Sequence, residues 1–231
     1  ELENALKLEG VSGVDAHDGY KLLHNKLTSK SGQGILVAVA NRIFSQEGVI
    51  LRKDFGDNAL KYYESEVELM DFANKAAESR VKINSWVEKQ TRDKIKNLIP
   101  DGLLNKDTQM VLTNAIYFKG DWEFKFDEKH TSKQPFFINE NDSTDVQMMF
   151  IKKKVNSGEV DDLDCKCLQL PYKGEALSMV ILLPNKKSGL AALEDKLSAS
   201  SLQAAISNIW NQETNINIPK FKLETSYNMT Q

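Results

Sequence analysis

The chain has 231 residues, of which 41% are hydrophobic and 27% are charged, and its formal net charge at pH 7 is -3. This is the composition of an ordinary globular protein, and the slight negative charge gives no reason to expect nucleic acid or an anionic membrane as a partner. No apolar run approaches the roughly 18–20 residues that a membrane-spanning helix needs.

Helices dominate the first hundred residues. Apolar spacing predicts a helix that ends before Gly10, a second over residues 15–27 with Asp15 as its cap, and a short third over 55–63. Strands are predicted over 35–44 and 67–72. The longest helical pattern runs over 74–97, and its apolar stripe consists of Ala77, Val81, Asn84, Trp86, Val87 and Ile95.

Residues 111–118 are almost continuously apolar and rich in strand-forming side chains. Such a run is typical of a strand buried on both faces in the middle of a large sheet. Asn114 lies inside the run, and a buried amide must be hydrogen-bonded or it costs roughly 1–3 kcal/mol. After a break at Gly120, an alternation of aromatic side chains predicts a further extended segment, with Trp122, Phe124 and Phe126.

Strands dominate the remainder of the chain. They are predicted over 135–138, 146–150, 152–155, 165–170, 177–183 and 216–223, with two helices over 190–197 and 202–209. Helices that cluster early and strands that follow indicate an α+β fold rather than alternating βαβ units. With no linker or internal repeat in view, residues 1–231 are predicted to form one domain.

No constellation for catalysis or cofactor binding is present. The sequence contains no GxSxG, HExxH, phosphate-binding or dinucleotide-binding motif. Its histidines, His17, His24 and His130, have no recognisable catalytic partners in the sequence. Cys165 and Cys167 share one face of a strand, predict free thiols, and make a poor zinc half-site without a second Cys or His pair. We therefore expect no catalytic residue, metal or cofactor, and a binding or mechanical protein instead of an enzyme.

Two further features are candidate surface sites. Three lysines on and after the second helix form a weak candidate patch for a sulfated polysaccharide: Lys21, Lys26 and Lys30. Asn141 and Asn228 begin glycosylation sequons, which matter only if the chain is secreted.

Several blocks, in order, resemble one family. The segment 114–122 (NAIYFKGDW) resembles the third strand of the large sheet in serpins with its following turn and tryptophan, and 39–44 (VANRIF) resembles the second strand. Residues 83–87 (INSWV) are similar to the helix that crosses this sheet. The segments 168–174, 178–184 and 218–222 are similar to strands of the other sheets. These blocks cover nearly the whole chain, and their wording is closest to the ovalbumin-like clade.

The resemblance implies the serpin fold, in which a large mixed sheet carries a crossing helix and is accompanied by two further sheets and clustered helices. The 231 residues resemble the central part of a serpin, without its first helices and without its reactive-centre loop. The family implies a serine protease inhibitor, whose cleaved loop inserts into the large sheet and traps the protease covalently. A non-inhibitory serpin, such as a carrier, chaperone or storage protein, is the alternative. The implied partners are a serine protease and the remaining serpin segments.

The resemblance also assigns roles to single residues. Asn114 matches the asparagine of the shutter at the sheet centre, whose hydrogen-bonding partners we expect outside this chain. Trp122 and Lys220 match the breach, where the loop first enters, and Asn84 and Trp86 lie on the crossing helix. The sequons and the habits of the family favour secretion, whereas the ovalbumin-like wording favours the cytoplasm. Alone, the 231 residues are expected not to inhibit and to aggregate, because parts of both sheets would be uncovered.

Overall fold

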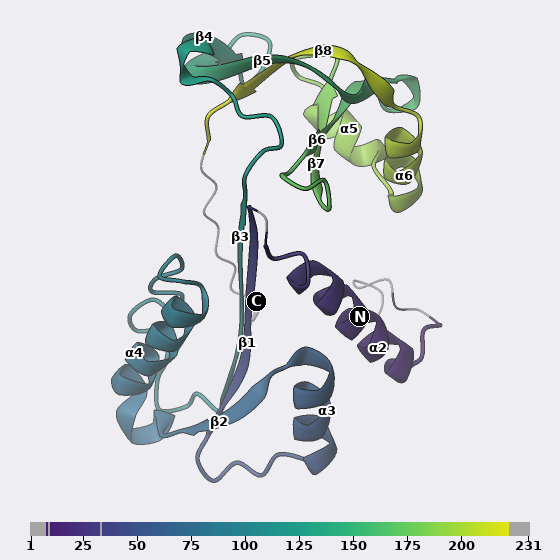
Figure 1. The fold of residues 1–231 in the computed structure, drawn as a ribbon. Helices are drawn as coiled ribbons and strands as arrows, with labels where there is room; N and C mark the ends of the chain where they lie inside the picture. Colours follow the sequence, from purple (N-terminus) through teal and green to yellow (C-terminus); the bar gives the residue numbers. More distant parts are fainter. Residues whose placement is uncertain (1–7, 9, 33, 222–231) are drawn as a thin grey trace. The chain divides into compact units, whose positions relative to one another are not determined.

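The computed structural model describes residues 8, 10–32 and 34–221 (Figure 1). The sequon at Asn228 therefore lies outside the described residues. So does the helix predicted before Gly10, apart from residue 8. Internal contacts group the chain into two compact units, residues 1–119 and 120–231. Each unit is described by itself, and the single domain expected from the sequence stays a prediction.

The first unit is built on a three-stranded sheet with the strand order β2-β1-β3. Its helices and strands are α2 (Gly13–Thr28), β1 (Ile35–Gln46), α3 (Lys53–Tyr63), β2 (Glu66–Met70), α4 (Phe72–Gln90) and β3 (Met110–Gly120). β1 and β2 run parallel, with Arg42 opposite Glu66. β1 and β3 run antiparallel, because Thr113 Oγ1 donates to the carbonyl of Arg42 and the amide of Gln46 donates to the carbonyl of Gln109.

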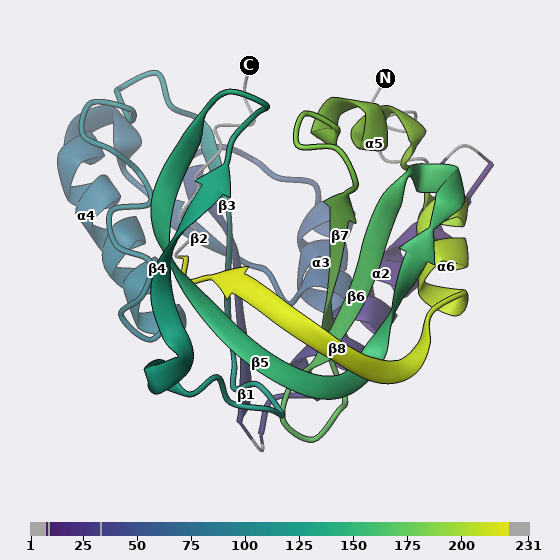
Figure 2. The same cartoon turned by 90° about the horizontal axis from the view of Figure 1, so that it is seen from above.

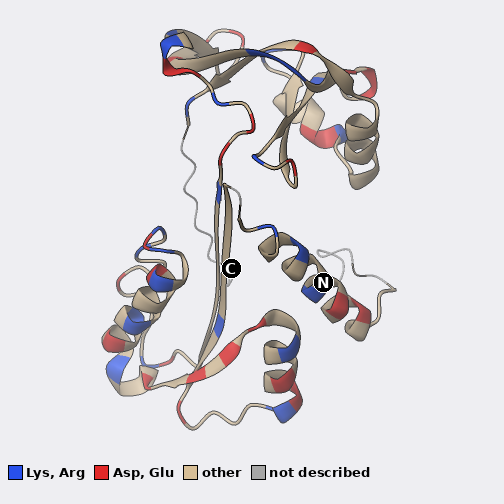
Figure 3. Cartoon of the chain, viewed as in Figure 1, with Lys and Arg blue, Asp and Glu red and all other residues tan. Residues whose placement is uncertain are grey.

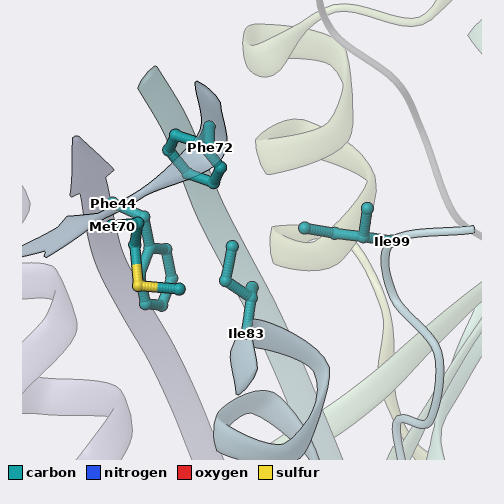
Figure 4. Close-up of a cluster of buried hydrophobic side chains, with 5 residues drawn as sticks. All are labelled: Phe44, Met70, Phe72, Ile83 and Ile99. Carbon is teal, nitrogen blue, oxygen red and sulfur yellow. The ribbon is translucent and has the colours of Figure 1, made fainter. Parts of the chain in front are cut away.

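Helix α4 packs against this sheet through one of its faces. The side chains of Ser79, Ile83 and Val87 recur at every fourth position of the helix and are buried. The resulting core joins α4, β1 and β2 with the loop that follows the helix, and Figure 4 shows its five members, Phe44, Met70, Phe72, Ile83 and Ile99. A second cluster joins α4 to two neighbouring strands of the sheet, through Ala40 on β1, Val87 on α4 and Ala115 on β3.

The prediction that residues 111–118 are buried on both faces is wrong for this structure. β3 is the last strand of its sheet, and its side chains alternate between the covered and the open face. Thr113 and Ala115 are buried, whereas Leu112 and Ile116 are 69% and 60% exposed. No element of the described residues covers the second face, so the apolar run is buried on one side only.

The second unit is built on a five-stranded sheet in which β4, β5, β6 and β7 follow one another and β8 pairs with the other edge of β5. Its helices and strands are η1 (Glu128–His130), β4 (Thr131–Phe137), β5 (Ser143–Val160), η2 (Asp161–Leu163), β6 (Cys165–Pro171), β7 (Ser178–Pro184), α5 (Leu190–Lys196), α6 (Ala199–Ser207) and β8 (Trp210–Pro219). β5 is a single long strand, which pairs with β4 near its start and with β6 near its end. Figure 2 shows β8 running alongside β5 in this unit.

Each face of this sheet carries an apolar cluster. One cluster consists of Val155, Leu170, Ile216 and Ile218, and the aromatic side chains of residues 122, 124 and 126 pack against it. These aromatics thus share a face, as their alternation predicts, although only Trp122 makes a strand bridge, to Tyr172. The other cluster places Cys165 against the two short helices, through Leu193 and Ala205.

Several boundaries differ from the sequence prediction for identifiable reasons. The cap of α2 is Ser12, whose hydroxyl accepts the amide of Asp15, so Asp15 lies inside the first turn. The predicted strands 146–150 and 152–155 are one strand, because β8 pairs continuously with residues 148–157, including Ile151 between them. The last strand begins at Trp210, before the predicted start, and α4 ends at Gln90 with Val81 exposed. The early helices and the later strands that the sequence predicts are otherwise present, and the α+β fold class is confirmed.

Candidate functional site

Asn114 forms a hydrogen bond across the three-stranded sheet. Its Nδ2 donates to Oδ1 of Asn41 at 2.6 Å, which links β3 to β1 on the face opposite α4. Asn114 is exposed here, so the prediction that it is buried is wrong. The expectation that its partners lie outside the chain is also wrong in part, because Asn41 belongs to the same sheet.

Asn41 extends this link to the two helices of the same unit. Its Nδ2 lies 3.0 Å from the hydroxyl of Tyr20 on α2 and 3.2 Å from the carbonyl oxygen of Tyr63, the last residue of α3. The hydroxyl of Tyr63 lies 2.7 Å from Nδ1 of His17. Burial raises the pKa of Tyr63 above its usual value, so this phenol stays protonated at neutral pH. A continuous polar chain therefore runs from the edge strand through β1 to α2.

Asn84 fixes helix α4 to the segment that follows it. Its Nδ2 donates to the carbonyl of Ile99 at 2.9 Å, and its Oδ1 accepts the amide of Ile99 at 2.8 Å. Both hydrogen bonds are buried. The side-chain amide of Asn84 therefore pairs with the backbone N–H and C=O of Ile99, which lies outside any helix or strand.

Trp86 attaches the same helix to β1. Its ring stacks under the guanidinium of Arg42, with 4.7 Å between the guanidinium carbon and the ring centroid, and contacts Phe44 edge to face. Arg42 in turn forms ion pairs with Glu66 and Glu68 of β2. Acidic and basic positions are otherwise interspersed along α4, as Figure 3 shows. The polar attachments of α4 are therefore to β1 and β2, whereas its contacts with β3 are apolar, through the clusters that include Ala115 and Val111.

The two predicted breach residues, Trp122 and Lys220, belong to the second unit. Trp122 packs against the cluster that contains Ile216 and Ile218, and Lys220 follows two residues later. The side chain of Lys220 is exposed, and its amide donates to the carbonyl of Gln147 at 2.8 Å.

The three lysines proposed for polysaccharide binding do not share one helix face. Lys21 and Lys26 are five residues apart on α2, which separates their directions by roughly 140°. Lys30 lies beyond the end of the helix. The geometry therefore adds no support to a polysaccharide partner.

The first sequon lies in the tip between β4 and β5. Asn141 is exposed, and its amide N–H donates to Oδ1 of Asn139, which also accepts the amide of Asp142. The turn is thus organised by Asn139, and the side chain of Asn141 is on the surface.

The histidines and cysteines show no catalytic or metal-binding arrangement within residues 8, 10–32 and 34–221. His24 lies 3.4 Å from a carboxylate oxygen of Glu64, and no group of three or more possible metal ligands occurs in those ranges. Cys165 and Cys167 are free and buried, and burial raises the pKa of both thiols, with Asp164 and Glu159 adding to the effect on Cys165. No helix in the described part of the chain is long and apolar enough to cross a membrane.

A helix packed on a mixed sheet and a separate antiparallel sheet are elements of the fold that the sequence resemblance implies. A family model described as Serpin (serine protease inhibitor) matches residues 1–231. The chain belongs to the serpin family. Human serpin B4 is 42% identical over 220 residues, which are 94% of this chain and 56% of that protein.

Two further relatives agree with this assignment. Human plasminogen activator inhibitor 2 is 38% identical over 228 residues, covering 96% of this chain and 54% of that protein. The structure of ovalbumin from emu (Dromaius novaehollandiae) matches with a TM-score of 0.91 and 31% identity, covering 99% of this chain and 62% of that chain. These similarities show an α+β serpin fold. The chain spans little more than half the length of the relatives it matches.

Some residues of the site were not singled out in the sequence. Asn41 is a polar residue inside the apolar run of β1, and this was the available signal for a partner of Asn114. Arg42 lies next to it and carries a charge in the same run. Tyr172 and Glu123 carried no such signal, because the pairing of Tyr172 with Trp122 and the contact of Glu123 with Gly174 depend on the fold.

Proposed function

We propose that the protein to which these 231 residues belong inhibits a serine protease and is not itself an enzyme. A bait loop is offered as substrate, and the protease serine attacks its scissile carbonyl. The amine side leaves, and the loop remains joined to the protease by an ester. The loop then inserts as an added strand beside β3, and the protease is trapped before water can hydrolyse the ester.

The observation that carries the proposal is the match of residues 1–231 to a family model described as Serpin (serine protease inhibitor). The edge of β3 is the place that the proposal gives to the inserted strand. In the described ranges, β3 pairs with β1 along one edge only, and it presents two exposed apolar side chains, Leu112 and Ile116, on its open face. An added strand gains a ladder of backbone hydrogen bonds at such an edge and helps to bury neighbouring apolar groups. The names of relatives such as plasminogen activator inhibitor 2 support inhibition of a protease.

The contacts of the site suggest a role for each proposed residue. Asn114 holds the sheet centre through Asn41, and rearrangement of that link accompanies insertion. Trp86 and Asn84 keep α4 attached to β1 and to the loop at Ile99, so that the helix stays with that side of the sheet. Trp122 and Lys220 belong to the place where the loop first enters.

The test uses the longest natural polypeptide that contains this sequence. It is incubated with trypsin-like, chymotrypsin-like and elastase-like serine proteases, and the mixtures are separated in SDS. The proposal predicts a band at the summed mass with at least one protease, because an ester survives SDS. The same protease with its serine blocked must give no such band. If no protease in the panel gives one while the loop is cleaved, the protein is a non-inhibitory serpin, such as a carrier, chaperone or storage protein.

A further inference from the structure

The segment that follows β3 binds to the end of strand β6. The amide of Glu123 donates to the carbonyl of Pro171 at 3.0 Å, and the amide of Lys173 donates to the carbonyl of Asp121 at 2.8 Å. These bonds form a short antiparallel bridge that pairs Trp122 with Tyr172. The residues before and after Trp122 are therefore both hydrogen-bonded to the segment around Tyr172.

The two paired aromatic rings stack. The ring centroids of Trp122 and Tyr172 are 4.7 Å apart, and the ring planes differ by 7°. Tyr172 is 6% exposed, and burial raises the pKa of its phenol, so the ring stays neutral at physiological pH. Trp122 also packs on the apolar cluster of Leu170 and Ile216, so its ring is bounded by Tyr172 and by the sheet.

The turn that carries Tyr172 is unusual in its backbone. Gly174 and Glu175 both have positive φ angles, +81° and +57°, and the amide of Glu175 donates to the carbonyl of Tyr172 at 2.8 Å. A non-glycine residue in the left-handed region is strained, and it persists only where neighbouring bonds enforce it. The turn therefore needs contacts that hold it in place.

One such contact comes from the side chain of Glu123. Its Oε2 accepts the amide of Gly174 at 3.0 Å, at the first of the two left-handed residues. Glu123 is adjacent to Trp122 in the chain, and successive side chains of an extended segment point to opposite sides. Trp122 therefore stacks its ring on Tyr172, and Glu123, the next residue, accepts a hydrogen bond from the turn through its carboxylate.

We propose that Glu123 is a positioning residue for Trp122: by holding the turn at Gly174, its carboxylate keeps Tyr172 stacked on the tryptophan. This inference rests on the proposed function only in giving Trp122 a role at the point of loop entry. In that role, an indole held in one orientation gives the inserting loop a single surface to pack against. A loose indole lets cleaved loops be released before they insert, so that the inhibitor is consumed as a substrate.

The direct test is ¹⁹F NMR of the longest natural polypeptide, labelled with 5-fluorotryptophan. The chain here contains three tryptophans, Trp86, Trp122 and Trp210, and the signal of Trp122 is assigned with Trp122→Phe. We expect Glu123→Ala to shift and broaden the signal of Trp122 while the signals of Trp86 and Trp210 stay in place. Glu123→Gln keeps an acceptor oxygen and is expected to leave all three signals near their original positions.

Two companion variants keep the test decisive if Glu123→Ala fails to fold. Tyr172→Ala removes the stacked ring and should move the signal of Trp122 as Glu123→Ala does, whereas Tyr172→Trp keeps an aromatic ring at this position and should move it less. In the inhibition assay, we expect Glu123→Ala to raise the number of inhibitor molecules consumed per trapped protease about threefold or more, with Glu123→Gln unchanged.

The outcomes separate the two proposals. An unchanged Trp122 signal in Glu123→Ala, or an equal shift in Glu123→Gln, overturns the positioning role. A shifted signal with no change in the inhibitor consumed per trapped protease shows that Glu123 shapes the turn without serving inhibition, which also overturns the inference. If the unaltered protein traps no protease while the Trp122 signal responds as expected, the proposed function fails and the contact between Glu123 and the turn stands.

Discussion

Asn114 donates a 2.6 Å hydrogen bond to Asn41, and this bond joins the edge strand β3 to its neighbour β1 on the face opposite helix α4. Because Asn41 also reaches Tyr20 and the carbonyl of Tyr63, the position of the edge strand is coupled to two helices. In the proposed function, insertion of another strand rearranges this link.

Replacing Asn114 by alanine should therefore lower the free energy of unfolding by about 1 kcal/mol, the usual net contribution of one hydrogen bond. Asn41→Ala should cost more, because it also removes the bonds to Tyr20 and Tyr63. Urea unfolding of both single variants and of the double variant measures the coupling. A double variant whose loss equals the sum of the two single losses would show that the two amides do not interact.

Asn84→Ala should destabilise the protein by roughly 1–3 kcal/mol, because it leaves the buried amide of Ile99 without its partner and the carbonyl of Ile99 with only the 3.5 Å bond from Arg80. Ser85→Ala is the matched control: Ser85 is next in the same helix but exposed, so its loss should be within about 0.5 kcal/mol. The measurement is the urea midpoint of each variant. Equal midpoints for the two variants would contradict the role of Asn84 in pinning α4.

The two buried thiols predict a dependence of stability on pH. Burial raises the pKa of Cys165 and Cys167 above the ordinary value of 9.0, so the folded state keeps these protons at a pH where the unfolded state loses them. The stability from these groups is complete below pH 9 and is lost as the pH rises through the folded-state values. The raised pKa of Tyr63 and that of Tyr172 act in the same direction at higher pH.

The check is thermal unfolding in reductant between pH 7.5 and 10, with Cys165→Ala/Cys167→Ala as the comparison. The unaltered protein should lose stability more steeply above pH 9 than the double variant, although the variant starts lower because it loses buried side-chain volume. Parallel curves for the two proteins would show that the thiols titrate alike in the folded and unfolded states.

Asn141 is expected to carry a glycan when the protein passes through a secretory pathway, because it is exposed in the turn between β4 and β5. Intact mass before and after treatment with a glycan-cleaving amidase measures this, and Ser143→Ala, which removes the sequon, is the control. A secreted protein whose mass is unaffected by the amidase would rule out modification at this asparagine.

The sequence predicts most of the elements, since their periodicity is local. It predicts the burial of β3 less well, because covering that strand depends on segments far away in the chain: the same apolar run reads as a central strand, yet Leu112 and Ile116 are exposed in the described residues. The two short strands predicted on either side of Ile151 are one strand for a similar reason, since β8 supplies a continuous partner for residues 148–157.

The candidate site shows the same division. Asn114, Asn84, Trp86 and Trp122 were selected through the family resemblance, and the structure gives partners within the chain for all four. Those partners include Asn41, Ile99, Arg42 and Tyr172, and they come from distant segments that no local pattern connects. The roles of these residues in loop insertion, and that of Lys220, remain predictions.

The most direct test of strand insertion is the unfolding temperature of the longest natural polypeptide before and after its exposed loop is cut once by a protease. An inserted strand adds several kcal/mol of pairing and burial beside β3. At about 2–4 °C per kcal/mol for a chain of this size, the cut form should unfold more than ~10 °C higher than the intact form. A cut form that unfolds at the same temperature as the intact protein, or below it, would contradict insertion at this edge.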